Sequence, residues 1–160
     1  EIYNSVPQSL KKAKEAGYLL IIISNQSGVA RGYFNEDFVL QSYHHINDSI
    51  AKWDVSFDGF FYCPHHPEGL VSPYKKQCSC RKPMIGLIEQ ALDQFPIDLS
   101  KSYMIGDKLC DIELAKKAKI KGLLVTTGHG KTSQAEVEEH FPGTPIFAKL
   151  DKAINYILSN

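Results

Sequence analysis

Four residues of the types that bind zinc lie close together in this sequence. Cys63 and His65 form one pair, and Cys78 and Cys80 form a second pair after a short loop. Thiolates and an imidazole can fill the four corners of a tetrahedral zinc site, and two such pairs joined by a loop have suitable spacing. The pattern predicts a structural zinc centre at these four residues.

A disulfide and buried reduced thiols are the alternatives to a zinc centre. The remaining cysteine, Cys110, lies far along the chain at the start of an expected helix, so the three clustered cysteines cannot pair evenly without it. The zinc interpretation is therefore favoured, and no role is assigned to Cys110. The neighbouring His66 is expected to point away from His65 and to be a solvated loop residue.

Two cations, Arg81 and Lys82, follow the last clustered cysteine directly. A guanidinium group can bind a phosphoryl group as a fork, and an ammonium group can bind it as a point charge. An isolated Arg-Lys pair is also common as plain surface charge. A zinc centre at the preceding cysteines would fix the direction in which both cations point.

Two further polar segments carry candidate chemistry. Residues 24–28, Ser-Asn-Gln-Ser-Gly, group several neutral hydrogen-bond donors that suit a phosphate, although an ordinary turn has the same composition. In residues 106–111, a carboxylate can hold magnesium, which prefers hard oxygen ligands. Asp107 or Asp111 can instead cap a helix, and for Asp111 a cap, a supporting carboxylate and a metal ligand look alike in sequence.

The elements that must position these residues alternate between short apolar runs and amphipathic stretches, which predicts a parallel α/β sheet in one domain, residues 1–160. Helices are expected over 5–17, 35–52, 85–95, 111–118, 133–139 and 150–158. Strands are expected over 18–24, 57–62, 102–105, 123–126 and near Ile146. The strand over 18–24 is expected to be covered on both faces. The helix over 35–52 is expected to bury Phe38, Tyr43, Ile46, Ile50 and Trp53.

The polar segments all fall at expected strand ends, where open sheets of this kind bind their ligands. The 18 basic and 18 acidic side chains give a formal net charge of +0, so no overall field attracts nucleic acid or a membrane surface. The sequence also contains no recognisable secretory signal, transit peptide or long apolar segment. We therefore expect a cytoplasmic monomer with neither nucleic acid nor a membrane as its partner.

Four motifs together resemble the haloacid-dehalogenase (HAD) superfamily, and within it the D-glycero-D-manno-heptose 1,7-bisphosphate 7-phosphatase family. The motifs lie at residues 24–32, 63–67, 78–83 and 106–108, and the resemblance runs over nearly the whole chain. It implies a Rossmann-like core with a parallel sheet, a zinc-binding loop and no large cap domain. It also implies magnesium and zinc as cofactors.

The resemblance implies a role for each motif. Ser24 would contact the phosphoryl group, Arg81 would recognise the substrate, and Lys82 would stabilise the phosphoryl group and its aspartyl intermediate. Asp107 would hold magnesium, with Lys108 beside it at the substrate. The other residues lining the substrate site would be Asn25, Gln26 and Ser27. The zinc ligands would be Cys63, His65, Cys78 and Cys80.

The sequence departs from the family pattern at its beginning. The family starts with a strand ending in Asp-x-Asp, whose aspartates serve as nucleophile and as general acid and base, and this chain contains no Asp-x-Asp. Asp58 precedes a glycine, but it stands at the start of a strand and is rejected as a substitute. In the superfamily the first strand lies between the strands that here end at Ser24 and Ile105, whose edges would otherwise be unpaired. We expect such residues before Glu1 in the natural protein, and activity only with them present.

The function implied is magnesium-dependent removal of the 7-phosphate from a heptose 1,7-bisphosphate, in the synthesis of nucleotide-activated heptose for the lipopolysaccharide core. The substrate would be a small phosphorylated sugar. Histidinol-phosphate phosphatases share the zinc loop and are the nearest alternative, but residues 26–32 resemble the heptose enzymes more closely. A noncatalytic, zinc-bearing phosphate-binding module is the third hypothesis, should the natural chain be this short.

Overall fold

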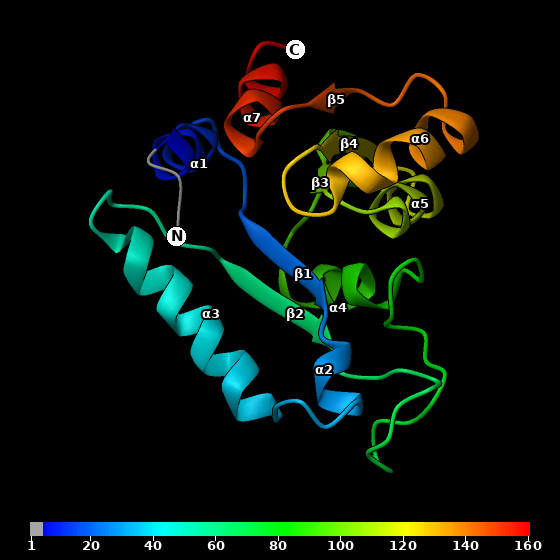
Figure 1. Ribbon diagram of the computed structural model, residues 1–160. Coiled ribbons are helices and arrows are strands. Elements are labelled where there is room, and N and C mark those ends of the chain that lie inside the picture. The colour runs from blue at the N-terminus through cyan, green and yellow to red at the C-terminus, as the bar shows by residue number, and fades with distance from the viewer. Residues whose placement is uncertain (1–4) are drawn as a thin grey trace.

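The computed structural model describes residues 5–160 and shows helices arranged around two small parallel sheets (Figure 1). One sheet pairs β1 (Ile21–Asn25) with β2 (Gly59–Cys63), and the other has the order β3 (Tyr103–Gly106), β4 (Lys121–Val125), β5 (Ile146–Phe147). The α-helices are α1 (Ser5–Glu15), α2 (Ser27–Ala30), α3 (Glu36–Ala51), α4 (Gly86–Gln94), α5 (Leu109–Lys117), α6 (Gly130–His140) and α7 (Leu150–Leu158). The predicted parallel α/β class is confirmed.

Every helix and strand expected from the sequence is present, with ends that differ by a few residues. The sequence interpretation missed the short helix α2 and the 3-10 helix η1 (Leu99–Lys101), because single turns carry too little periodicity to detect. Along residues 5–160, none of the helices combines the length and the hydrophobicity needed to cross a membrane.

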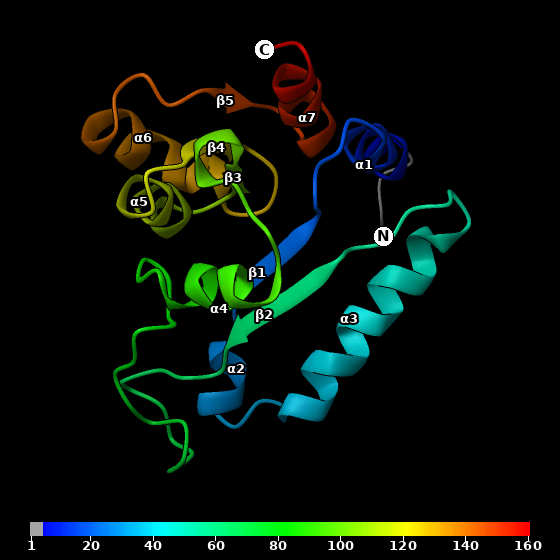
Figure 2. The same ribbon diagram turned by 180° about the vertical axis from the view of Figure 1, so that it is seen from behind.

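The β1–β2 pair is covered by α3 on one face and by α4 on the other (Figures 1 and 2). Side chains alternate along β2, so that Phe60 stacks on Tyr43 of α3 while Phe61 packs in a cluster with Leu87 of α4. Asn35 caps α3, because its side chain accepts a hydrogen bond from Phe38 N at 3.0 Å. These two layers position the end of β2, where Cys63 lies.

The two sheets are joined by packed side chains. Ile23 of β1 packs against the cluster that contains Met104 of β3, and Leu20 shares another cluster with Ile105. Within residues 5–160, β1 pairs only with β2, and β3 only with β4. The strands that end near Ser24 and Ile105 therefore each have an unpaired edge, as expected from the sequence, and β2 and β5 form the other edges of the two sheets.

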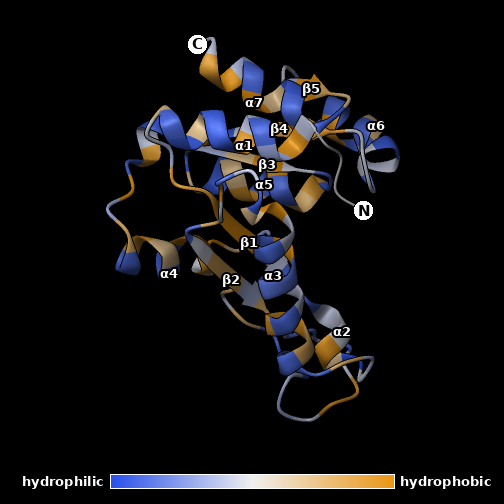
Figure 3. Cartoon of the chain, turned by 90° about the vertical axis from the view of Figure 1, so that its left-hand side faces the viewer, coloured by the Kyte–Doolittle hydropathy of each residue, from blue (hydrophilic) through white to orange (hydrophobic). Residues whose placement is uncertain are grey.

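Three burial expectations were wrong. Phe38 is 54% exposed and Ile46 is 38% exposed, whereas Val39 and Ile50 are the buried residues of α3. The strand β1 is only half-buried along its length, and Leu19 before it is exposed. In Figure 3 hydrophobic residues colour most of β1, and hydrophobic and hydrophilic residues alternate along α3. A sheet of two strands can cover only a narrow part of α3. The apolar face of the helix is wider than this part, so some of its apolar side chains stay exposed.

Asp58, which was rejected as a nucleophile, lies just before β2 and joins three elements. Its carboxylate accepts hydrogen bonds from Leu20 N at 2.7 Å and from Lys14 Nζ at 2.6 Å. Since β1 and β2 are parallel, this is the sheet end opposite to Asn25 and Cys63. We expect Asp58→Ala to lower the free energy of unfolding by about 1–3 kcal/mol, because a half-buried backbone N–H loses its acceptor.

Chemical denaturation measures this effect of Asp58→Ala. Lys11→Met is the control, because the ion pair between Lys11 and Asp54 is solvent-exposed and should leave the midpoint unchanged. Equal midpoints for the Asp58 variant and the wild type would show that the carboxylate does not hold the strands together.

Candidate metal centre and phosphate site

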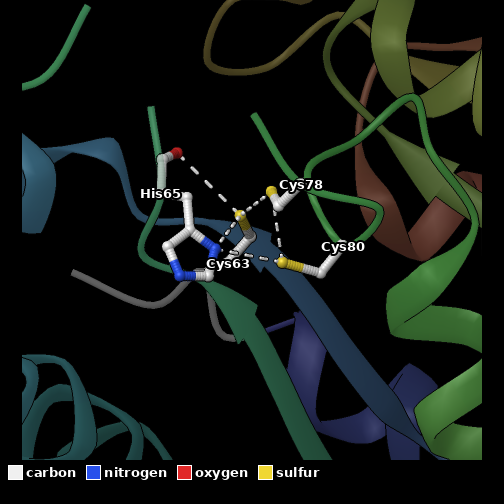
Figure 4. A group of neighbouring side chains, drawn as sticks. All are labelled: Cys63, His65, Cys78 and Cys80. Carbon is white, nitrogen blue, oxygen red and sulfur yellow. Dashed lines mark hydrogen bonds between the residues drawn. The ribbon is translucent and has the colours of Figure 1, made fainter. Parts of the chain in front are cut away.

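The predicted zinc ligands converge on one point. The donor atoms of Cys63, His65, Cys78 and Cys80 all lie within 4.8 Å of one another (Figure 4). Cys78 Sγ is 3.5 Å from Cys63 Sγ and 3.4 Å from Cys80 Sγ, and His65 Nδ1 is 3.4 Å from Cys80 Sγ. A tetrahedral zinc with ordinary bond lengths separates its ligands by roughly 3.5–3.8 Å, so the four donors fit such an ion.

These ligands come from the end of β2 and from the metal loop, which we define as residues 64–85. The loop contains neither α-helix nor strand. All four cysteines of the chain are free, so the disulfide alternative is not observed. Burial raises the pKa of the Cys63 thiol, and burial lowers the pKa of His65, which favours the neutral imidazole that a metal needs. A bound cation would stabilise the thiolate forms.

Arg81 and His66 lie beside the metal loop ligands without joining them. Arg81 Nη1 donates a hydrogen bond to His65 O at 3.2 Å. His66 is half-buried, its Nε2 is 3.3 Å from Arg31 Nη2, and its Nδ1 accepts a hydrogen bond from Glu68 N. Burial and the nearby guanidinium groups of Arg81 and Arg31 lower the pKa of His66. His66 is therefore a loop residue outside the ligand cluster, as expected, although it is half-buried and not fully solvated.

Lys82 connects the polar groups at the ends of β1 and β3. Its Nζ donates a hydrogen bond to Ile23 O at 3.0 Å and lies 2.6 Å from Asp111 Oδ1. Asp111 is buried, and its other oxygen accepts a hydrogen bond from Lys108 N at 3.1 Å. Asp111 therefore caps α5 and also pairs with Lys82, so the helix-cap alternative that the sequence left open is present together with an ion pair.

Asp107 follows β3 and is oriented by the loop after β4. Its Oδ2 accepts a hydrogen bond from His129 N at 2.9 Å. The adjacent Gly128 has φ +60°, and a Cβ atom there would collide with the Asp107 carboxylate. Lys108 is exposed next to it. The predicted magnesium ligand Asp107 is thus held in place at the carboxyl end of β3. In the chain it lies four residues before Asp111, which pairs with Lys82.

The segment after β1 is held by hydrogen bonds. Gln26 Nε2 donates to Ser24 Oγ at 2.8 Å, and Ser27 begins α2. Asn25, which was expected to line the substrate site, uses its side chain on the backbone of Lys82. Its Oδ1 accepts from Lys82 N at 2.9 Å, and its Nδ2 donates to Lys82 O at 3.1 Å. Sequence reasoning missed this positioning contact, because nothing local relates residues so far apart in the chain.

Removal of the Asn25 side chain should release the Lys82 backbone. We expect Asn25→Ala to lower the free energy of unfolding by about 1–3 kcal/mol, because the Lys82 N–H and C=O lose their partners. Hydrogen exchange gives the specific readout, since the Lys82 amide should lose protection. Ser27→Ala is the control in the same segment, and an equally protected Lys82 amide in Asn25→Ala would contradict the assignment.

A separate open hollow lies beside the metal loop. Its volume is about 550 Å³, and its lining contains none of the predicted site residues. The lining residues are Val29, Gly32, Phe34, Asn35, Phe38, Val71 and Tyr74. The polar groups that suit a phosphate are instead gathered at the carboxyl ends of β1 and β3.

A parallel α/β fold with a lysine, carboxylates and hydroxyls at its strand ends is the arrangement of a HAD-like hydrolase. Residues 79–153 match the family described as "HAD-hyrolase-like". The crystal structure of D,D-heptose 1.7-bisphosphate phosphatase from B. bronchiseptica, complexed with magnesium and phosphate, superposes with a TM-score of 0.85. That protein is 26% identical, and the match covers 98% of this chain and 83% of that one.

Curated relatives are more similar in sequence. The D-glycero-beta-D-manno-heptose-1,7-bisphosphate 7-phosphatase of Haemophilus influenzae is 44% identical over 134 residues, which cover 83% of this chain and 72% of the relative. The protein of the same name from Escherichia coli K12 is 40% identical over 137 residues, which cover 85% and 72%. This chain belongs to that phosphatase family of the HAD superfamily, as its motifs predicted.

Proposed function

We propose that the protein is a magnesium-dependent phosphatase that removes the 7-phosphate of D-glycero-D-manno-heptose 1,7-bisphosphate. The proposal is supported by the relatives of that name and above all by one contact, the Lys82–Asp111 pair at the strand ends. We place it in the cytoplasm as a monomer with a small phosphorylated sugar as substrate. Its product would serve the synthesis of nucleotide-activated heptose for lipopolysaccharide. A net charge of +0 supports neither nucleic acid nor a membrane as a partner.

The proposed chemistry divides the work among the residues at the strand ends. Ser24 accepts a hydrogen bond from Gln26, so its own O–H is free to donate to a phosphoryl oxygen. Lys82 supplies the positive charge that offsets the charge gathered on the phosphoryl group, and Arg81 contacts the rest of the substrate. The attacking aspartate is not part of residues 1–160. We assign it to an Asp-x-Asp strand that would pair with the unpaired edges of β1 and β3 in the same sheet.

Two metals belong to the proposal. Asp107 would hold magnesium, with Lys108 on the substrate side and Asp111 behind. Magnesium, when bound, neutralises charge on the phosphoryl oxygens. Zinc at Cys63, His65, Cys78 and Cys80 would be structural, because four protein ligands leave no open position for substrate. Its task is to hold the loop that carries Arg81 and Lys82.

Phosphate release by the full natural protein tests the proposed function. We expect release from C7 of the heptose bisphosphate to be faster than release from histidinol phosphate, and to be lost in Lys82→Met. Faster release from histidinol phosphate would contradict the heptose substrate and would identify the protein as a histidinol-phosphate phosphatase. Release from neither substrate would favour a noncatalytic phosphate-binding module.

A further inference from the structure

Glu36, to which the sequence analysis assigned no role, lies at the contact of three elements. It is in the first turn of α3, and its Oε2 accepts a hydrogen bond from Tyr62 Oη at 2.6 Å. Its Oε1 accepts a second hydrogen bond from Tyr74 Oη at 2.7 Å. Tyr62 precedes Cys63 on β2, and Tyr74 belongs to the metal loop. One carboxylate therefore ties the helix, the strand and the loop together.

The geometry of Glu36 differs from that of an ordinary acid at the start of a helix. Asp37, in the same turn, is exposed and favours the helix through its charge alone. Glu36 is half-buried, and the hydrogen bonds from Tyr62 and Tyr74 hold its pKa below the usual range. Hydrogen bonds to a charged acceptor are about twice as strong as neutral ones, so both tyrosines are firmly held.

Tyr74 connects this carboxylate to the metal ligands. Its ring centre is 6.3 Å from that of His65, and its backbone oxygen accepts a hydrogen bond from His66 N at 3.1 Å. The metal loop has no helix or strand of its own, so its order depends on contacts such as these, together with turns inside the loop and the hydrogen bonds between Asn25 and Lys82. Two more are backbone bonds from Leu70 and Val71 to Ala30 O.

We propose that Glu36 is a positioning residue for the metal loop, which it orders through Tyr62 and Tyr74 so that the four ligands stand ready for zinc. The inference rests on the proposed zinc centre. Metal binding must supply the free energy to order any ligand loop that is not already ordered, and prior ordering lowers that cost. Loss of the Glu36 contacts should therefore weaken zinc binding although every ligand remains.

Zinc affinity, measured by competition with a chromogenic chelator, tests the inference. We expect the dissociation constant to rise roughly tenfold in Glu36→Ala and somewhat less in Tyr74→Phe, which removes one hydroxyl only. Glu36→Gln should recover part of the affinity, because an amide can still bond to both tyrosines. Asp37→Ala is the matched control, since it removes an exposed acid from the same helical turn, and it should bind zinc as the wild type does.

Hydrogen exchange of the metal-free protein gives a second readout. The amides of residues 66–76 should exchange faster in Glu36→Ala than in Asp37→Ala. Unchanged affinity and unchanged exchange in both Glu36→Ala and Tyr74→Phe would overturn the inference while the zinc centre stands. Equal loss of affinity in Asp37→Ala would also overturn it, since the effect would then belong to the helix. A wild type that binds no zinc would reject both the zinc centre and the inference.

Discussion

Cys80→Ser is expected to lower zinc affinity by roughly a hundredfold or more and to remove the stabilisation that the proposed zinc centre would give the fold. Structural zinc sites in small domains contribute about 10–16 kcal/mol of apparent binding free energy, and a serine hydroxyl is a poor substitute for a thiolate. Cys80 Sγ is also in contact with Cys78 Sγ at 3.4 Å and with His65 Nδ1 at 3.4 Å, so its loss opens the centre of the cluster. Zinc content and thermal unfolding with and without chelator measure the effect.

The same substitution should disturb the proposed phosphate site, because Arg81 and Lys82 follow Cys80 directly in the chain. Arg81 bonds to His65 O and Lys82 to the end of β1, so both cations depend on the fold of the metal loop. Cys110→Ser is the control, since Cys110 lies on α5 outside the cluster and should leave zinc content unchanged. Full zinc content and an unchanged unfolding temperature in Cys80→Ser would reject a structural metal at these residues.

The clustering of Cys63, His65, Cys78 and Cys80 could be predicted from the sequence because its signal is local. Two ligands on either side of one loop need only that loop to close, and cysteine and histidine at such spacing have few other uses. The strand and helix order was predictable for a similar reason, since continuous apolar runs and amphipathic periods report the buried faces of a parallel α/β fold.

The contacts of Asn25 and Glu36 could not be predicted, because each joins segments that only the folded sheet brings together. The local sequence predicts that Asn25 is a turn residue and that Glu36 is an acid in the first turn of a helix. The exposure of Phe38 also lies beyond sequence reasoning. An apolar stripe predicts a packed helix face, but its burial depends on what lies against it, and here Phe38 contacts Phe34 at the edge of the open hollow.

The second large effect is expected for the ion pair between Lys82 and Asp111, which links the metal loop to α5. Their side chains are only 11% and 4% exposed, and Nζ lies 2.6 Å from Oδ1. Removal of one partner leaves the other charge in a site with little water, which typically costs 3–5 kcal/mol. We therefore expect Lys82→Met to lower the free energy of unfolding by about 3 kcal/mol, as measured by chemical denaturation.

A double-mutant cycle separates this pair from the general loss of a long side chain. Asp111→Asn keeps an acceptor for Lys108 N but removes the charge that Lys82 faces. If the ion pair accounts for the lost stability, the double variant should lose less unfolding free energy than the two single variants lose in sum. The reason is that neither buried charge remains without its partner in the double variant. Lys108→Met, an exposed lysine beside the same aspartate, should change stability little. Additive costs in the cycle would mean that Lys82 stabilises the sheets through Ile23 O and its packing rather than through Asp111.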